Sequence, residues 1–383
     1  MKKVVALVMA LLLGLSLIAC GNEEPAPIAC GNEEPAPSAT ETDAATTTPE
    51  SSPEAEGGLK ELYASMSNEG IYLANDDLPE VQAKEEFTIG IAMTTVSTDW
   101  FKSLADETQA QVEAAGCKAL VSICEDDVTQ QIAQLENFMA QGVDGIILGP
   151  CNPQDALTPV LNELAEAGIP VVTVNDTVAA DAPIFCAVSV DAYELGKGVG
   201  SYLAEQLLEM YPDAETIEYA LIGGKDGDAI AHNRNEGAKA GVAEVDTEGK
   251  IQLVSFLYSG GYSEENGLET AQNMLTANPD IKCIIGTCDS HVIGASQAMT
   301  VLGMDDPKSV IMGAVDGSTT AMESIKNGGS IVCTGMNDTH AFGVLSTRIL
   351  VAYLNDGTLP ESNNIIQQPV ICTIDNVDEY YSG

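Results

Sequence analysis

The chain has 383 residues and a formal net charge of −43, because 58 Asp and Glu residues stand against 15 Lys and Arg residues. Phosphate backbones are bound by clustered Lys and Arg, so a chain this acidic is not expected to bind nucleic acid. The charge favours solubility and repulsion from anionic surfaces, and it carries no information about the fold.

The N-terminus has the layout of an export signal. Lys2 and Lys3 form a basic start, and residues 4–18 form an apolar stretch too short to span a bilayer comfortably. The tetrapeptide LIAC, which ends at Cys20, resembles a bacterial lipobox. We therefore predict a signal peptide at 1–19 and lipidation of Cys20, which would anchor the protein to the cell membrane. The alternative is an ordinary secretory signal with an incidental cysteine, and in either case the chain is exported.

A repeat and a polar segment follow the signal. Residues 18–27 (IACGNEEPAP) recur unchanged as 28–37, so Cys30 is a copy of Cys20 that lacks the preceding apolar stretch. No Lys or Arg occurs between residues 21 and 58, and such a segment cannot bury enough apolar surface to offset its chain entropy. We interpret 20–58 as the lipidated N-terminus and a disordered acidic linker. Residues 59–86 have weak periodicity and are expected to form a partly ordered extension.

From residue 87 onward, short apolar runs alternate with amphipathic segments. Predicted strands are 87–93, 119–123, 143–149, 169–174, 184–189, 217–222, 250–257, 281–286, 309–315, 330–335 and 365–372. Predicted helices are 100–115, 129–141, 153–167, 192–211, 229–243, 262–277, 289–302, 318–327 and 339–356. This alternation, with nearly continuous apolar strands, indicates an α/β fold with parallel sheets covered on both faces. So many strands are best divided between two doubly wound lobes.

Helix ends carry recognisable signals. Several predicted helices stop at a glycine, where a left-handed residue is expected: Gly116, Gly142, Gly168 and Gly303. Thr98 or Asp99 is expected to cap the first of these helices and Thr129 the second. Gly196 and Gly198 lie in a GKGVG sequence that superficially resembles a dinucleotide-binding loop, but the sequence lies inside a helical pattern, so we assign it no such role.

Cysteine usage leaves two interpretations open. The chain has ten cysteines, and eight of them lie singly within or beside apolar runs of the predicted domain. None has the paired spacing of a zinc site, so no metal is expected. Free, largely buried thiols are favoured over disulfides.

Polar loops follow the predicted strands. They lie at 94–101, 175–177, 223–228, 288–291, 316–318 and 337–339. Ligands bind at the carboxyl ends of the strands in such sheets, and so these loops are the candidate site.

Six sequence segments, taken in order, carry a family resemblance. They are DWF at 99–101, LGPCNP at 148–153, GIPVVTVND at 168–176, NRNEGAKAG at 233–241, GAVDGS at 313–318 and MND at 336–338. With this order and spacing, the chain from about Phe87 onward resembles the sugar-binding branch of the type I periplasmic-binding-protein superfamily, as for ribose and glucose/galactose. The resemblance implies two lobes joined by a three-strand hinge with a ligand cleft between them. The first lobe would comprise 87–191 plus 338–366, and the second 192–337 plus 367–383.

The resemblance also implies a set of ligand-binding residues. Trp100 and Phe101 match the aromatic residues that stack on a sugar ring, and His232 matches the cleft arginine of the second lobe. The remaining positions that the resemblance suggests are Thr98, Asn175, Asp176, Arg234, Tyr262, Cys288, Asp289, Asp316 and Asn337. The Asn-Asp pair at 175–176, where ribose binders carry Asp-Arg, and Cys288, where they carry Asn, argue against ribose itself.

The implied function is capture of a monosaccharide or related polyol and delivery to the permease of an ABC importer. Alternatives are a receptor that reports to a membrane sensor or chemoreceptor, and a binder of a nucleoside or furanose-like signal. No nucleophile elbow, zinc-protease motif or phosphate-binding loop is present, so we expect neither an enzyme nor a cofactor. We expect an extracytoplasmic monomer.

Overall fold

The structure, a computed structural model, describes residues 58–304, 306 and 308–381. The predictions for the signal peptide, Cys20, the repeat and residues 20–57 of the linker therefore lie outside the described residues. All the described residues belong to one compact unit. Within them, no helix has the length and apolar character needed to cross a membrane.

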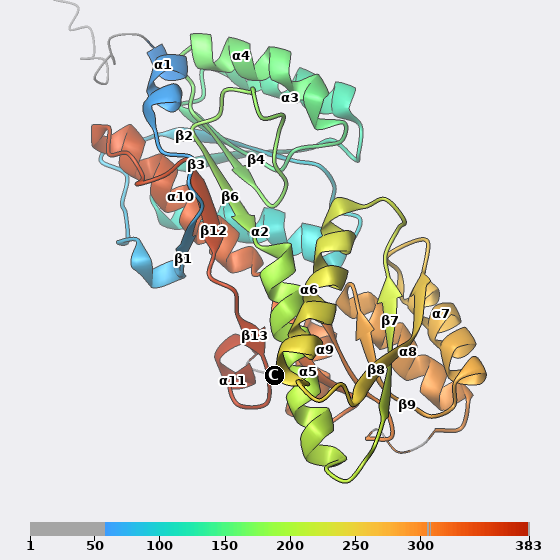
Figure 1. The fold of residues 1–383 in the computed structure, drawn as a ribbon. Coiled ribbons are helices and arrows are strands. Elements are labelled where there is room, and N and C mark those ends of the chain that lie inside the picture. The colour runs from blue at the N-terminus through green and yellow to red at the C-terminus, as the bar shows by residue number, and fades with distance from the viewer. Residues whose placement is uncertain (1–57, 305, 307, 382–383) are drawn as a thin grey trace, which may run out of the picture. The chain divides into compact units, whose positions relative to one another are not determined.

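Two sheets organise these residues (Figure 1). The first has seven strands, all parallel to their neighbours, in the order β1 (Ile71–Leu73), β12 (Asn364–Gln367), β6 (Cys186–Val190), β5 (Val171–Val174), β4 (Gly145–Leu148), β2 (Thr88–Met93) and β3 (Lys118–Ile123). The second has six strands, in the order β13 (Ile371–Cys372), β11 (Ile331–Met336), β10 (Ile311–Asp316), β9 (Ile281–Gly286), β7 (Ile217–Gly223) and β8 (Ile251–Tyr258). Only β13 in this second sheet is antiparallel to its neighbour.

Helices cover both faces of each sheet. Those of the first sheet are α1 (Gly58–Ser65), α2 (Asp99–Ala114), α3 (Val128–Gln141), α4 (Thr158–Glu166) and α10 (Thr339–Asp356), with short 3-10 turns η1 (Asn75–Asp77) and η2 (Gln154–Leu157). Those of the second are α5 (Ala192–Met210), α6 (Ala229–Val245), α7 (Glu264–Ala277), α8 (Asp289–Val301), α9 (Thr319–Lys326) and α11 (Val377–Tyr380). Ile147 faces the core under α2 and α10, whereas Ile146 and Leu148 face α3 and α4. Burial on both faces explains the continuous apolar runs of these strands.

The chain crosses between the sheets three times. It leaves the first sheet after β6, returns after β11 and leaves again after β12. We call each sheet with its helices a lobe. The α/β class and the paired parallel sheets predicted from the sequence are therefore confirmed.

The structure adds detail that the sequence did not indicate. Residues 59–86, expected to form a partly ordered extension, contain α1 and β1, and β1 forms the edge of the first sheet. The single strand predicted at 365–372 is two strands, β12 and β13, separated by Pro369, which lacks the N–H that a continuous strand would need. The predicted cap at Thr129 is wrong, because Asp127 accepts from the amides of Thr129 and Gln130.

Glycines bring α5 and α6 into close contact. A Cβ on Gly196 would lie 2.1 Å from the carbonyl oxygen of Arg234, and one on Gly200 would lie 2.1 Å from that of Ala238. This contact sets the position of α6, and hence of Arg234, against α5. The helical assignment of the GKGVG sequence is confirmed.

Eight cysteines lie in the described part of the chain, and all are unpaired and buried. They are Cys117, Cys124, Cys151, Cys186, Cys283, Cys288, Cys333 and Cys372. Burial raises the pKa of the Cys117 thiol to about 11, so the thiol form predominates at neutral pH.

Candidate functional site

A cavity of about 580 Å³ lies where loops of the two lobes meet the second crossing of the chain, from β11 to α10. It is lined by the first turn of α2, the turn between β10 and α9, and the segment from β11 to α10. Three of the predicted ligand residues line it: Trp100, Asp316 and Asn337. These three residues are far apart in the sequence, and the carboxyl ends of β2, β10 and β11 bring them together.

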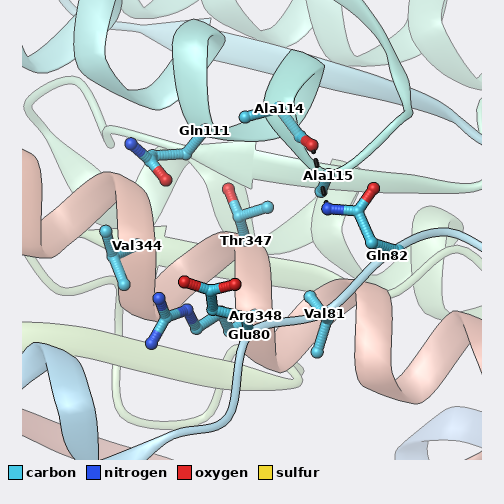
Figure 2. Close-up of a pocket in the computed structure, with 9 residues that line it drawn as sticks. All are labelled: Glu80, Val81, Gln82, Gln111, Ala114, Ala115, Val344, Thr347 and Arg348. Carbon is cyan, nitrogen blue, oxygen red and sulfur yellow. Dashed lines mark hydrogen bonds between the residues drawn. The ribbon is translucent and has the colours of Figure 1, made fainter.

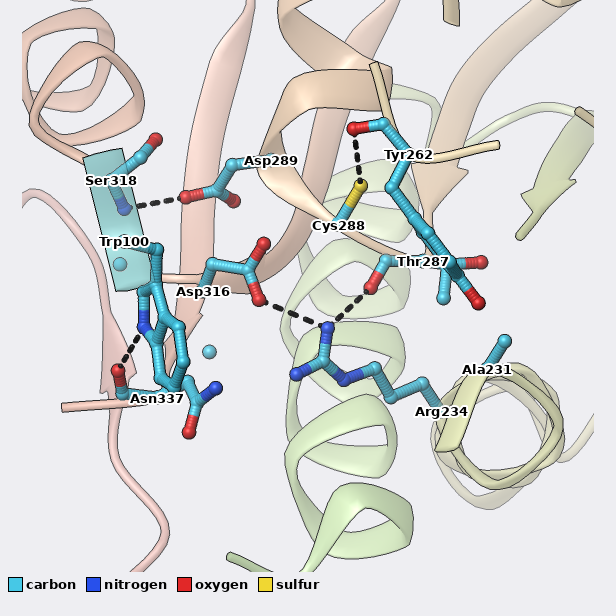
Figure 3. Close-up of polar contacts among 12 residues, drawn as sticks. Trp100, Ala231, Arg234, Tyr262, Thr287, Cys288, Asp289, Asp316, Ser318 and Asn337 are labelled. Atoms are coloured by element: carbon cyan, nitrogen blue, oxygen red, sulfur yellow. Dashed lines mark hydrogen bonds and ion pairs between the residues drawn. The ribbon is translucent and has the colours of Figure 1, made fainter. Parts of the chain in front are cut away.

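Trp100 lies in the first turn of α2 and is half-buried. Its indole Nε1 donates to the carbonyl oxygen of Asn337 at 2.8 Å (Figure 3). Its ring meets those of Phe101 and Phe342 edge-on. α2 begins here because the Thr98 hydroxyl caps it, accepting from the amide of Phe101. Thr98 therefore has a structural partner, and Phe101 supports the tryptophan and does not line the cavity.

Asn337 is buried, and its side-chain oxygen Oδ1 has no hydrogen-bond partner among the described residues. A buried polar atom without a partner costs free energy. The amide lies in the wall of the cavity, so a hydroxyl or amino group of a ligand could supply the missing bond.

Asp316 closes β10 with a positive φ of 145°, which places its side chain beside Arg234 (Figure 3). Arg234 Nη1 donates to Asp316 Oδ1 at 3.0 Å and to the carbonyl oxygen of Thr287 at 3.1 Å. Burial raises the pKa of the Asp316 carboxyl, and the Arg234 guanidinium opposes that rise. Arg234 is itself buried behind the carboxylate and does not line the cavity, so its direct partner is Asp316.

Asp289 was predicted as a ligand contact, but the structure places it behind the loop that carries Asp316. It is fully buried; its Oδ2 accepts from the Ser318 amide at 2.7 Å and its Oδ1 from the Thr334 hydroxyl at 2.8 Å. The same hydroxyl accepts from the Gly317 amide at 3.0 Å. Burial and the nearby Asp316 charge raise the pKa of Asp289 to about 7. Asp289 and Thr334 therefore hold the backbone of the 316–318 turn.

A second group of predicted residues lies outside this cavity. The Tyr262 hydroxyl donates to Asp228 Oδ2 at 2.6 Å, and the Cys288 thiol lies 3.9 Å from the Tyr262 carbonyl oxygen. In the first lobe, Asn175 donates to Asp176 Oδ2 at 3.1 Å. Burial raises the pKa of the Asp176 carboxyl, and the negative charge of Asp228 raises it further. Asp176 of the first lobe and Asp228 of the second therefore lie close enough to interact electrostatically.

The predicted residue His232 is exposed on the first turn of α6. No hydrogen bond of its side chain is seen among the described residues. Its place on the loop side of α6 leaves it accessible to a ligand, but the structure does not bring it to Trp100 and Asp316.

Several cavity residues were missed from the sequence. They include four carboxylates, Asp99, Glu107, Asp338 and Glu379, and also His340, which lies 3.0 Å from Glu107. In a chain this acidic, no single carboxylate stands out, so the sequence carried no signal for them. Asn75 and Tyr380 line the cavity from segments that precede and follow the recognised motifs. Within the described ranges, no group of three or more His, Cys, Asp and Glu side chains could hold a metal ion.

This chain is similar to a known protein family and to several known proteins. The family described as "Periplasmic binding protein domain" matches residues 89–358. The ribose import binding protein RbsB of Bacillus subtilis (strain 168) is 25% identical over 244 residues, which cover 64% of this chain and 74% of that protein.

Solved structures share the fold. A periplasmic ribose ABC transporter protein from Conexibacter woesei DSM 14684 has a TM-score of 0.67 at 23% identity, covering 80% of this chain and 97% of that one. A solute-binding protein from Actinobacillus succinogenes 130z with bound D-allose also has a TM-score of 0.67, at 24% identity, covering 77% of this chain and 100% of that one. Because the family match spans most of the chain and its fold is reproduced here, this chain belongs to the periplasmic binding protein domain family.

Proposed function

We propose that this protein captures a monosaccharide or related polyol outside the cytoplasm and delivers it to the permease of an ABC importer. One observation carries the proposal: Trp100, Asp316 and Asn337 line one cavity, and the buried Asn337 oxygen in its wall has no partner among the described residues. An aromatic face packs on the C–H side of a sugar ring, while a carboxylate and an amide bind its hydroxyls.

The ligand class also has support from relatives. The matching RbsB protein is a ribose import binding protein, and the Actinobacillus protein was crystallised with D-allose. Family membership implies an extracytoplasmic location. The family resemblance also argues against ribose itself, because Asn175-Asp176 and Cys288, which lie outside this cavity, depart from the pattern of ribose binders.

The excess of carboxylates around the cavity widens the ligand class. Asp99, Glu107, Asp316, Asp338 and Glu379 all line it. Arg234 pairs with Asp316 and His340 lies 3.0 Å from Glu107, while the other three form no ion pair in the described part of the chain. A ligand with an amino group would be tolerated there, whereas a sugar phosphate or uronic acid would meet like charge.

A thermal-shift screen of the purified protein tests the proposal. The panel should contain neutral hexoses, pentoses and inositols, the corresponding amino sugars, and sugar phosphates as negative controls. A ligand that binds only the folded state raises the melting temperature, and above its Kd the rise grows with the logarithm of its concentration. We expect a neutral or amino sugar to do so. A response to none of them, or only to phosphorylated sugars, would contradict the proposal.

We also propose that Cys20 is acylated and tethers the protein to the membrane through the linker. A single lipid chain binds membranes only marginally, whereas a multiply acylated cysteine anchors stably. Mass spectrometry of the intact membrane form should show a lipid-modified Cys20 as the N-terminus, and Cys20→Ala should abolish the modification. A mature chain that begins elsewhere would exclude it.

A further inference from the structure

The segment 58–86 precedes the residues that match the family, yet it is built into the first lobe. Leu59 and Tyr63 of α1 are buried in the core of that lobe. β1 lies beside β12 (Figure 1) and pairs with it in parallel. In this pairing Leu73 lies opposite Gln367. The Gln368 amide donates to the Leu73 carbonyl oxygen at 2.9 Å. β1 thus continues alongside the chain where it leaves the first sheet for the last time.

The first lobe also holds the segment beyond β1. Arg348 of α10 donates from Nη1 to the carbonyl oxygens of Asn75 and Leu78, both at 2.6 Å. Further along, Gln82 Nε2 donates to the Ala114 carbonyl oxygen at 3.1 Å. Between these two anchors, a polar cavity of about 200 Å³ separates the segment from α2 and α10 (Figure 2). β1 is therefore fixed on both sides to elements of the first lobe.

One side chain of β1 reaches the second lobe. The Tyr72 hydroxyl donates to Asp191 Oδ2 at 2.6 Å. Asp191 is the N-cap of α5, and its Oδ1 accepts from the amides of Tyr193 and Glu194, both at 3.0 Å. α5 packs in the core of the second lobe through Leu195 and Val199. Tyr72 therefore connects the edge strand of one lobe to the first turn of a helix in the other, across the first crossing of the chain.

Three connecting segments bend by changing a few backbone dihedrals, and a side-chain bond across one of them adds a restraint. We propose that Tyr72 is a positioning residue of the hinge, which restrains the movement of the two lobes through its bond to Asp191. The biological use of this restraint rests on the proposed ligand-binding function. The restraint itself acts with or without ligand. Asn75, three residues further on, lines the cavity itself, so the same short stretch contacts both hinge and site.

The test compares Tyr72→Phe with the wild type and with Tyr211→Phe, in the full chain without ligand. Tyr211 lies just after α5, at the end away from Asp191, and no hydrogen bond of its hydroxyl is seen among the described residues. A donor and an acceptor fluorophore on the exposed positions Ala110 of α2 and Thr300 of α8 report the distance between the lobes by single-molecule energy transfer. Melting temperatures within about 2 °C of the wild type would establish that each variant is folded.

We expect a broader distribution of interlobe distances in Tyr72→Phe, with the wild type and Tyr211→Phe alike. We also expect faster hydrogen exchange at the Tyr193 and Glu194 amides in Tyr72→Phe alone. A Tyr72→Phe distribution equal to that of the wild type would overturn the inference. Because no ligand is present, this result is independent of whether the sugar screen succeeds.

Discussion

At the scale of single residues, the site depends on Asp316, whose backbone turn is fixed by hydrogen bonds to the buried residues Asp289 and Thr334. Asp316 adopts a positive φ, a conformation that non-glycine residues rarely occupy without compensating contacts. Asp289 and Thr334 provide them by accepting the amides of Ser318 and Gly317. Burying the Asp289 carboxyl costs free energy, but its hydrogen bonds hold the backbone next to Asp316, the residue proposed to bind ligand.

This arrangement predicts that Asp289 acts on ligand binding through Asp316. Asp316→Ala should weaken binding by about 2–4 kcal/mol, because buried hydroxyls lose a charged acceptor. Asp289→Ala should weaken it by about 1–3 kcal/mol, by releasing the turn. In a double-mutant cycle measured by calorimetry, Asp289→Ala should cost almost nothing further once Asp316 is Ala. Thr334→Val serves as a milder second variant if Asp289→Ala folds poorly, and fully additive losses would contradict this role.

The buried Asp289 also predicts a pH dependence of stability. Its pKa in the folded protein is raised to about 7, above the value of roughly 3.9 expected in an unfolded chain. Between these two values the folded state binds a proton that the unfolded state does not, so stability falls as pH rises through this window. The melting temperature of the wild type relative to Asp289→Asn should therefore decrease from pH 5 to pH 8. A difference that is constant with pH, or that rises, would exclude the assignment.

At the scale of elements, the contact between α5 and α6 determines where Arg234 lies. The Arg234 carbonyl oxygen packs directly against Gly196, and a Cβ at this position would lie only 2.1 Å from that oxygen. A substitution there must push α6 away, and with it the guanidinium that holds Asp316.

Gly196→Ala should therefore destabilise the protein by about 1–3 kcal/mol through overpacking and should also weaken ligand binding. Gly198→Ala is the matched control: its Cβ would meet only side-chain atoms of Ile371, which can rotate away, and alanine favours the helix. Denaturant unfolding and calorimetry on both variants measure the two effects. Equal stabilities for the two variants would show that the close contact is unimportant.

At the scale of the whole molecule, most of the architecture could be predicted from the sequence. Apolar periodicity indicates which residues are buried, and glycines at helix C-termini indicate where helices end. The helix predicted at 100–115, which the structure places at Asp99–Ala114, and the strand 281–286 are examples. β1 could not be found, because three residues of an edge strand carry too little pattern to distinguish them from a loop. Asp127 was overlooked as a cap because the neighbouring Thr129 is an equally suitable residue type.

The site was predictable in composition but not in geometry. Family resemblance selected Trp100, Asp316 and Asn337, which the structure brings to one cavity. It also selected Asp289, although both of its oxygens are taken by the 316–318 turn and Thr334. Loop carboxylates such as Asp289 and Asp316 look equivalent in the sequence, and only the fold decides which of them lines the cavity. Asn75 could not be predicted as a cavity residue, because it lies in a segment without a recognisable motif and only the packing of that segment places it at the cavity.

The central claim is that the cavity lined by Trp100, Asp316 and Asn337 binds a monosaccharide or related polyol. Isothermal titration calorimetry with the sugar found by the thermal-shift screen tests it most directly, using wild type, Trp100→Ala and Asp316→Ala. Trp100→Ala should lose about 2–4 kcal/mol through lost stacking area, and Asp316→Ala a similar amount, while both variants keep the wild-type circular dichroism spectrum. Saturable binding with a one-to-one stoichiometry in the wild type, weakened at least 30-fold in both variants, is the predicted result. Unchanged affinity in both variants would contradict the account.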